Sequence, residues 1–512
     1  MKLTMECIKK YLYVYLMLSG MLANIAVLVG IIVIVHHYTA QGYSLSELAE
    51  TSVEKVGSKL PITIHGAEAS THTSLSHYAG IDIKKWEHRF SGSILNRDYS
   101  AYDESGRLIP LHSRKEKSMG APMREISVTD VPSFLAALKK ATPGTEIVLE
   151  PGRYRIKGKL IHIGHQGNIL APIYVTARHL GSVVIELETL EGFYIDKPYW
   201  VMQGLIISGV CKSDTRCEHA FHIVGNGKNA VIRNNVVRNF NAPVKVNGTK
   251  VAGKRTYPDN LLIENNSFYN EAVRNTGRPV TLLDILNVND SVVRGNLIAN
   301  FAKGGGNNIS YAAFFKGGGE NNVFERNLVI CNANLSLNKG ARVGLSFGGG
   351  GTGQSSCREG HCAAEQGRGV MRDNIIMHCS DVGIYLNKSG GTQIYNNTLI
   401  NTLGIDVRFK ESSAFIGNNI LTGRIKDRNS GSSKRVDNLV VDIDDIDDVF
   451  GNALAGDFSL TSPGKIVNKG KDLLSKESSF CGDDRGPESV DMGAIEYNNS
   501  TPPCVPLAGL VK

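Results

Sequence analysis

The sequence has no run of basic residues interleaved with aromatic residues, although 56 Lys and Arg against 49 Asp and Glu give a net charge of +7. Runs of that kind follow nucleic-acid backbones, so no nucleic-acid partner is expected. Tryptophan and proline are scarce, at 2 and 16 residues, whereas glycine is abundant at 55. Because no collagen-like triplet accompanies the glycine, it indicates many turns. The positive charge favours an anionic partner, and an acidic polysaccharide fits better than DNA.

Charged residues are also absent from residues 11–35, which are mostly apolar. About 20 apolar residues suffice for a helix to cross a bilayer. Lys2, Lys9 and Lys10 precede this stretch and no lysine follows until Lys55. The charge bias predicts that residues 1–36 form a cytoplasmic stub and transmembrane anchor, with the rest of the chain periplasmic or extracellular. A cleaved signal peptide is the alternative, but its apolar region would be shorter and no clear small-x-small cleavage site is present.

The cysteines support export. One cysteine, Cys7, precedes the apolar stretch, and an even number follows it: Cys211, Cys217, Cys331, Cys357, Cys362, Cys379, Cys481 and Cys504. An even set outside the cytoplasm predicts at least two disulfides. Close spacing favours the pairs Cys211–Cys217 and Cys357–Cys362. Cys331 can pair with Cys379 if their coils are neighbours. Zinc is a weak alternative, because CREGHC lacks a second Cys/His pair at zinc-finger spacing.

A repeat dominates the middle of the chain. Seven segments align without gaps and share an asparagine, at Asn235, Asn266, Asn296, Asn327, Asn374, Asn397 and Asn419. The steps between them are 31, 30, 31, 47, 23 and 22 residues. A step of 22 or 23 fits one coil of three short strands, and the larger steps add loops. The repeat predicts an all-β fold, a right-handed parallel β-helix (β-solenoid) over residues 125–436, with the asparagines bonded up a ladder.

The flanks of the repeat carry less periodicity. Residues 37–124 read as a stalk and lead-in. The segment from Val128 to Ala141 predicts a short helix that caps the open end of the solenoid, with Thr129 or Asp130 as its N-cap and Pro132 near its first turn. Residues 437–512 read as the end of the β-helix and a tail. The acidic run DIDDIDD (442–448) in that tail is a calcium-binding segment or, more commonly, a solvated loop.

A second strand in each coil alternates apolar with polar or aromatic residues. If the apolar set faces inward, the other set stacks along one outer face, about 4.8 Å apart per coil. This outward set mixes acids, bases and aromatics, which suits an extended sugar chain, although an ordinary solvated face is the alternative. The outward residues are His222, Lys245, Asn247, Asp284, Phe314, Lys316, Ser346, Tyr385, Asp406 and Arg408. The substrate-binding candidates among them are His222, Lys245, Asp284, Ser346, Tyr385 and Arg408.

The step of 47 residues contains a glycine-rich stretch, Phe347 to Gly369, without a strand pattern. A segment that can bury little apolar surface is expected to protrude from the helix. Long loops in compact folds are commonly functional, and a disordered insertion is the alternative. Because the loop leaves directly after Ser346, we expect it to overhang Lys316 and Arg342 and to form one wall of a sugar groove.

Three segments carry a resemblance to a known group of proteins. PGTEIVLEPGRY, APIYVTARHLGSVVIE and YWVMQGLIISG resemble the opening of polysaccharide lyases of the chondroitinase B and alginate lyase type, and GDFSLTSPG with DMGAIEY is similar to the ends of secreted β-helix proteins. The resemblance covers about Ile126 to Tyr497. It implies a right-handed parallel β-helix and, less specifically, the β-elimination of a uronate-containing polysaccharide.

The catalytic match to these lyases is partial. By resemblance, Lys316 in FFKGGGENN takes the place of the catalytic base, and Arg342 that of the partner acid, at a longer spacing than the pattern. The lyases hold calcium with two glutamates just before the lysine, where this sequence has Ile309 and Tyr311. The cofactor is therefore unknown, with calcium an open option in which Asp284 and other groups replace the glutamates. The alternatives to a lyase are a non-catalytic envelope polysaccharide-binding protein and a glycoside hydrolase on the same fold, with Asp284 and Asp406 as its outward acids.

Overall fold

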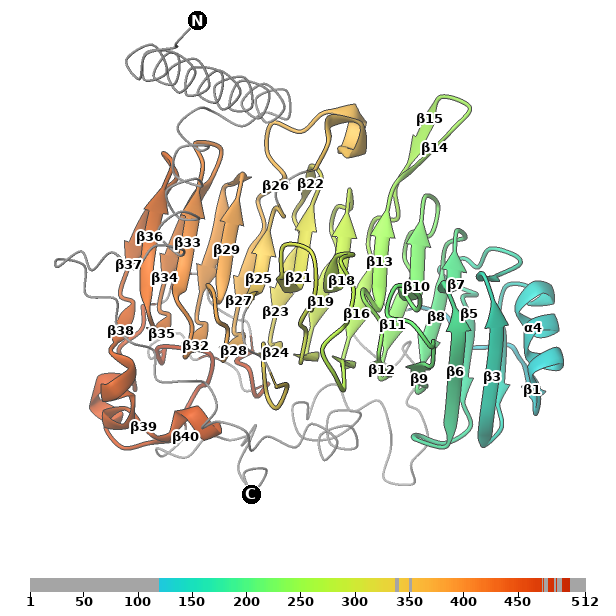
Figure 1. The fold of residues 1–512 in the computed structure, drawn as a ribbon, viewed down its shortest axis with the longest axis horizontal. Helices are drawn as coiled ribbons and strands as arrows, with labels where there is room; N and C mark the ends of the chain where they lie inside the picture. The colour runs from blue at the N-terminus through green and yellow to red at the C-terminus, as the bar shows by residue number, and fades with distance from the viewer. Residues whose placement is uncertain are drawn as a thin grey trace, which may run out of the picture. The chain divides into compact units, whose positions relative to one another are not determined.

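A computed structural model describes residues 119–336, 340–349, 352–471, 473, 478–482, 485 and 490–497. These residues form a parallel β-helix whose coils follow one another along the long axis of Figure 1. The expected all-β parallel solenoid is confirmed. Within this part of the chain, no helix is both long and apolar enough to cross a membrane. The expected anchor at residues 11–35 and the stalk up to residue 118 lie outside the described residues.

Each coil contributes one strand to each of three long sheets. The first sheet contains β1 (Arg124–Val128), β2 (Thr145–Leu149), β5 (Ile173–Ala177), β8 (Trp200–Gln203), β11 (Val231–Arg233), β16 (Leu262–Glu264), β19 (Val292–Arg294), β23 (Val323–Glu325), β27 (Val370–Arg372), β31 (Thr392–Tyr395), β34 (Ser413–Gly417) and β37 (Ser432–Val436). The second contains β3 (Gly152–Gly158), β6 (Val183–Thr189), β9 (Ile206–Gly209), β12 (Val236–Arg238), β17 (Ser267–Tyr269), β20 (Leu297–Ala299), β24 (Leu328–Ile330), β28 (Ile375–Met377), β32 (Thr398–Ile400), β35 (Ile420–Thr422) and β38 (Leu439–Val441). The third contains β4 (Ile161–His162), β7 (Glu191–Ile195), β10 (His219–Val224), β13 (Val244–Asn247), β18 (Val280–Leu286), β21 (Ile309–Lys316), β25 (Ala341–Phe347), β29 (Ile384–Asn387), β33 (Gly404–Arg408) and β36 (Arg424–Arg428).

The asparagine ladder forms the corner between the first and second sheets. The Nδ2 of each repeat asparagine donates to Oδ1 of the next, from Asn235 to Asn266 at 3.0 Å through to Asn397 to Asn419 at 2.9 Å. The ladder continues one rung further, because Asn419 Nδ2 donates to Asn438 at 2.8 Å. Residues before the rungs adopt positive φ, as at Asn234 (56°), which turns the chain sharply. Asn327 bonds directly to Asn374, so the step of 47 is one coil with an insertion.

The interior of the solenoid is a continuous apolar core. Inward side chains from all three sheets pack in columns, as where Phe324 lies 4.7 Å from Phe315 and 5.5 Å from Phe347 between ring centroids. Parallel strands of successive coils pair in register, so each inward residue contacts its counterpart on the next coil. This packing fixes which residues of the third sheet face outward.

The helix α4 (Val131–Lys140) covers the first coils, as expected for a terminal cap (Figure 1). Asp130 is the N-cap and accepts from Ser133 N at 2.8 Å, and the helix buries Phe134 and Leu138. The expected start at Val128 is wrong, because Val128 ends strand β1, which pairs with β2. An open strand edge binds the preceding segment before the helix begins.

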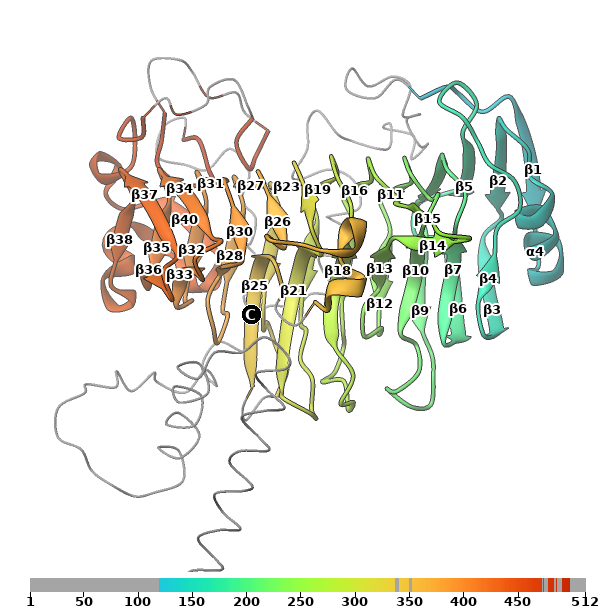
Figure 2. The same ribbon diagram turned by 90° about the horizontal axis from the view of Figure 1, so that it is seen from above.

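Extra elements are inserted between the third sheet and the next strand of the first sheet. A hairpin, β14 (Thr249–Val251) with β15 (Lys254–Thr256), follows β13. The glycine-rich loop follows β25 and contains η3 (Gln354–Ser356) and η4 (Arg358–Gly360). Both project from the same edge of the solenoid in Figure 1, and Figure 2 shows η3 and η4 beside the hairpin. A small parallel sheet of β22 (Gly319–Glu320), β26 (Gln366–Gly367) and β30 (Ser389–Gly390) lines this corner.

The last coil is followed by η5 (Ile443–Asp448), η6 (Ala453–Ala455) and η7 (Pro463–Lys465), with the antiparallel pair β39 (Phe450–Asn452) and β40 (Asp457–Leu460) between them. The acidic run forms η5, where Asp442 is the N-cap and Ile446 is buried. Across the described residues, no three His, Cys, Asp or Glu side chains are grouped so as to hold a metal ion.

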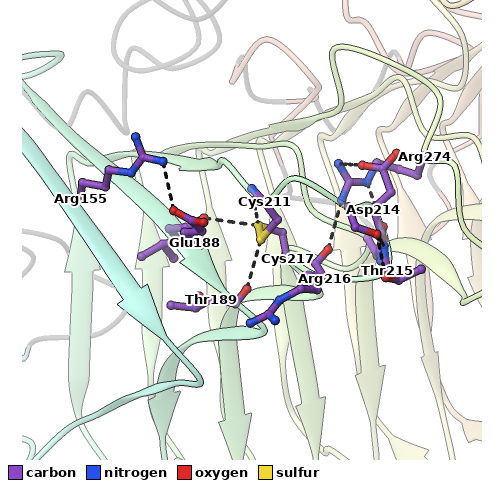
Figure 3. The surroundings of a disulfide bond; sticks show 12 residues. Arg155, Glu188, Thr189, Cys211, Asp214, Thr215, Arg216, Cys217 and Arg274 are labelled. Carbon is purple, nitrogen blue, oxygen red and sulfur yellow. Dashed lines mark hydrogen bonds and ion pairs between the residues drawn. A yellow bond between two sulfur atoms is a disulfide. The ribbon is translucent and has the colours of Figure 1, made fainter.

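Three disulfides staple the described coils. Cys211–Cys217, Cys331–Cys379 and Cys357–Cys362 are all formed, and Cys481 is disulfide-bonded too, which confirms the expected minimum of two. The second pair joins neighbouring coils, because β24 pairs with β28. In Figure 3, the loop closed by Cys211–Cys217 lies against the following coil, where Asp214 pairs with Arg274 at 2.8 Å. Disulfides are typical of a domain outside the cytoplasm.

Candidate functional site

A row of polar and aromatic side chains follows the outer face of the third sheet. Register pairs join the residues of the row one coil at a time, and their neighbours on each strand are buried in the core. The row is His162, Tyr194, His222, Lys245, Asp284, Phe314, Ser346, Tyr385, Asp406 and Lys426. All of the sequence-based binding candidates except Arg408 lie in this row. Arg408 belongs to a second row, two residues further along the strands, with Asn247, Lys316 and Asn387.

Lys316 is the most unusual member of the second row. Its Nζ lies 4.3 Å from the centroid of the Phe314 ring, and within the described chain it has no carboxylate within ion-pairing distance. Burial is the largest cause that lowers the pKa of Lys316, and the charge of Lys245 lowers it further, against the opposing charges of Asp284 and Glu365. A partly desolvated, unpaired amine with a lowered pKa can act as a proton acceptor.

A charged pair lies beside Lys316 in the first row. Lys245 Nζ contacts Asp284 Oδ2 at 2.6 Å, and both side chains are mostly buried. The other carboxylate oxygen of Asp284 is buried without a hydrogen-bond partner. A second carboxylate, Glu365, comes from the glycine-rich loop and accepts from Gly317 N at 3.0 Å. The site thus combines two lysines with two acids that are already engaged by the protein.

The structure does not bring Arg342 to Lys316, contrary to the sequence-based pairing. Ser310 is opposite Arg342 and Phe315 is opposite Phe347, so Lys316 is level with Gly348, six residues beyond Arg342. At about 3.3 Å per residue, the two positions are about 20 Å apart. Arg342 is buried at the other end of the sheet and donates from Nη1 to Gly340 O at 3.2 Å. Strand register sets this distance, and the chain spacing between the residues does not reveal it.

Rings of three coils stack at the N-terminal end of the row. The centroid of Tyr194 lies 5.7 Å from that of His162 and 5.5 Å from that of His222, both edge to face. His222 is held by Glu191, whose Oε2 lies 2.8 Å from Nδ1, and by Asn247, whose Oδ1 lies 2.9 Å from Nε2. We call His162, Tyr194 and His222 the ring column. Its faces and edges are suited to the apolar and hydroxyl surfaces of a sugar.

The C-terminal half of the row is more closely packed. Ser346 is fully buried and its hydroxyl donates to Gly348 O, so it is not presented to a ligand. Tyr385 accepts at its hydroxyl from Asn387 at 3.1 Å, and burial raises the pKa of Tyr385. Arg408 is partly exposed and contacts the same hydroxyl at 3.5 Å. Asp406 is bonded to Arg428. Arg408 is therefore the side chain of this half best able to meet an anion.

The residues around Lys316 do not fit the calcium site that the lyase resemblance implies. Ile309 and Tyr311 stand where glutamates would be needed, and Tyr311 packs in an apolar outer cluster with Val343. The two nearby carboxylates, Asp284 and Glu365, bind Lys245 and a backbone N–H. A calcium ion needs six to eight oxygen ligands, and two lysines in their place repel it.

Two acids and two rings of the site escaped the sequence-based prediction. Glu191, Tyr194 and His162 lie on early strands that were not aligned with the repeat, and their outward alternation was the missed signal. Glu365 lies in the glycine-rich loop, where no periodicity could indicate its direction. The loop does lie against Lys316 as expected, because a Cβ at Gly349 would be 2.9 Å from Lys316 Cδ. It does not reach Arg342, whose side of the sheet it leaves.

Comparisons with known proteins agree with this architecture. Residues 351–438 match the family model described as periplasmic copper-binding protein (NosD). The chain is 31% identical over 151 residues to pectate lyase L of Dickeya chrysanthemi, covering 24% of this chain and 35% of the relative. It is 30% identical over 171 residues to pectate lyase L of Dickeya dadantii (strain 3937), covering 28% and 38%. The chain thus spans little more than a third of the length of these relatives.

A solved structure shows the fold over a longer stretch. The crystal structure of pectate lyase Pel9A superposes with a TM-score of 0.50 and 17% identity, covering 74% of this chain and 98% of that one. At this identity the likeness establishes the fold, a parallel β-helix of the kind used by polysaccharide lyases. The expected resemblance is thus confirmed for the fold, and the activity rests on the side chains described above.

Proposed function

We propose that this chain is an exported, membrane-anchored polysaccharide lyase that cleaves an acidic, uronate-containing polymer by β-elimination. The observation that carries the proposal is Lys316, an outward lysine with a lowered pKa and no ion-pair partner, set on a row of polar side chains. The partial identity to pectate lyase L and the β-helix fold support the reaction class. The three disulfides and the uncharged residues 11–35 support export and the anchor.

The reaction assigns a role to each member of the site. Neutral Lys316 takes the proton α to the uronate carboxylate, the electron pair forms a carbon–carbon double bond, and the glycosidic oxygen leaves from the β carbon. Negative charge grows on the carboxylate during proton removal and needs a nearby cation. Lys245 is held by Asp284 close enough to influence Lys316 electrostatically, so it is placed to stabilise that charge. Arg408, three coils along the second row, binds a further carboxylate of the polymer.

The hydrolase alternative has little support in this geometry. Asp284 and Asp406 are four coils apart in the row, which is about 19 Å at about 4.8 Å per coil. Paired carboxylates of glycosidases are separated by about 5–9.5 Å. Each of the two acids is also bonded to a basic side chain. A non-catalytic polysaccharide-binding protein is the second candidate, and the same row of side chains supports it.

A lyase assay separates these candidates. Purified protein is incubated with a panel of uronate polymers and neutral polysaccharides, and the unsaturated product is followed by its ultraviolet absorbance. Product from an acidic polymer supports the lyase. Binding without product on every uronate polymer tested would leave the binding protein as the function, and a rise in reducing ends without absorbance would indicate hydrolysis.

The acid limb of the pH–rate profile is expected to follow Lys316. Activity should rise with pH as Lys316 loses its proton, with a midpoint below the ordinary lysine value of 10.5 because its pKa is lowered. Replacing Lys245 with Met removes a repelling cation and frees Asp284 to stabilise protonated Lys316, so both effects raise its pKa. The limb should move to higher pH by about 1–3 units. An unmoved limb in Lys245→Met would contradict the assignment of the limb to Lys316.

The ring column is expected to bind the sugars furthest from Lys316. Tyr194→Ala should weaken binding of oligosaccharides long enough to reach β7, by roughly 5- to 10-fold if a stacking contact of about 1 kcal/mol is lost. Short oligosaccharides that occupy only the Lys316 region should bind as before. Calorimetric titration of a length series would measure both, and equal losses at every length would exclude a separate role for the column.

A further inference from the structure

Two inserted segments of the chain meet at the corner beside Lys316, although they leave the third sheet from strands several coils apart. The first is the hairpin after β13 with its return, residues 248–261. The second is the glycine-rich loop after β25, residues 348–369. The intervening strands β18 and β21 end beneath them. In Figure 2, η3 and η4 of the loop lie over β18, next to β14 and β15 of the hairpin.

Arg358 makes most of the connection between the two segments. Its Nη1 and Nη2 donate to the two carboxylate oxygens of Asp259 at 2.7 and 2.9 Å, in a bidentate pair. The same Nη1 donates to Asn287 O at 2.7 Å, and the guanidinium lies 4.0 Å from the centroid of the Tyr257 ring. The Cys357–Cys362 disulfide closes a small ring that includes Arg358. This geometry is that of a fixed fastening with several simultaneous contacts.

Further bonds reinforce the contact at each side of Arg358. Arg255 donates to Cys357 O at 3.3 Å, and Glu359 N donates to Tyr257 Oη at 2.9 Å. Asn287 Nδ2 donates to Ser356 O at 2.7 Å and to Gly317 O at 2.8 Å. Because Gly317 follows Lys316 directly, Asn287 links the fastened loop to the turn that ends the lysine's strand.

The rest of the loop lies against Lys316 itself. Glu365 accepts from Gly317 N at 3.0 Å through its carboxylate, and its carbonyl accepts from Gly318 N at 2.8 Å. A Cβ at Gly349 would lie 2.9 Å from Lys316 Cδ and 3.4 Å from Nζ, which is backbone contact along the lysine side chain. The loop therefore excludes water from one side of the amine and fixes the turn that follows it.

We propose that Arg358 is a positioning residue for Lys316. It acts through the loop, which it fastens to the hairpin so that Gly349 and Glu365 hold the amine in its partly desolvated place. Charged groups that face Lys316 come from three other elements: Asp284 on β18, Lys245 on β13 and Glu365 in the loop. Releasing the loop admits water and moves Glu365, while Asp284 and Lys245 stay on their strands. The inference rests on the proposed function only for its effect on turnover.

The test follows the titration of Lys316 directly. Full-length protein is methylated on its lysines with ¹³C-formaldehyde, and the dimethyl-lysine signals are followed by NMR as a function of pH. The Lys316 signal is identified by its loss in Lys316→Arg. In the wild type it should titrate below the other lysines. In Arg358→Ala its midpoint should rise toward 10.5 by about one unit, a fraction of the roughly 3–5 units that full burial produces.

Matched variants separate this effect from a general loss of structure. Arg368→Ala removes the same charge from the same loop but breaks a pair with Glu320 on an exposed surface, so the Lys316 midpoint should not move. Tyr257→Phe keeps the ring under Arg358 and removes only the bond to Glu359 N, so a smaller rise is expected. Circular dichroism melting checks that each variant is folded.

The outcomes distinguish the inference from the proposed function. If Arg358→Ala folds and the Lys316 midpoint equals that of the wild type, Arg358 has no positioning role. If the midpoint rises while the wild type releases no unsaturated product from any uronate polymer, the fastening is established and the lyase proposal fails. If both hold, the acid limb of kcat/KM should shift in Arg358→Ala by the same amount as the NMR midpoint.

Discussion

Replacing Lys316 with alanine is expected to lower kcat by about 10²–10⁴-fold, the usual contribution of a general base. The fold should persist, because Lys316 has no ion-pair partner in the described chain that its loss would leave unpaired. Its ammonium interacts only with the Phe314 ring among the aromatic contacts. Initial rates on the best uronate polymer, together with thermal melting, measure the two effects separately.

A matched control for this variant is Lys410→Ala. Lys410 is an exposed lysine in the turn after β33, on the same edge of the solenoid as Lys316. Its removal changes the net charge equally and should leave both kcat and Tm close to those of the wild type. Undiminished turnover in Lys316→Ala would remove the base assignment, whereas a comparable loss in Lys410→Ala would show that bulk charge is responsible.

Replacing Asn296 with alanine is expected to cause the largest loss of stability among single polar substitutions in the coils. Its Oδ1 accepts from Asn266 N at 2.9 Å and from Asn266 Nδ2 at 3.0 Å, and its own Nδ2 donates to Ile263 O at 2.9 Å. All of these groups are buried and cannot turn to water. With at least two backbone groups left unpaired at about 1–3 kcal/mol each, the free energy of unfolding should fall by about 3–6 kcal/mol.

Calorimetry and denaturant unfolding of Asn296→Ala measure this loss. The control is Asn307→Ala, an exposed asparagine whose Oδ1 accepts from Ile309 N at 3.1 Å in a surface turn. It should change the free energy of unfolding by no more than about 1 kcal/mol, since water replaces the lost bond. Equal effects of the two substitutions would mean that the ladder does not stabilise the coils.

The ladder and the outward row were predictable from the sequence for the same reason. A solenoid repeats its backbone geometry, so residues at equal positions of successive repeats must stack. Aligning the seven asparagines thus identified their bonding partners, and the alternation along the next strand identified His222, Lys245, Asp284 and Lys316 as outward. The disulfide between Cys331 and Cys379 followed too, once the intervening insertion was assumed to loop out.

Contacts between insertions, by contrast, were decided only by the tertiary structure. Nothing periodic relates Arg358 to Asp259 or Glu365 to Gly317, since loops of unequal length carry no register. The same limit produced the error at Arg342, which was placed beside Lys316 from its chain spacing although the register sets it about 20 Å away. The sequence by itself determined the coil, its ladder and the direction of its strand side chains, because these repeat locally. Which carboxylates and loops surround the lysine depended on where aperiodic segments come to rest, and only long-range packing decides that.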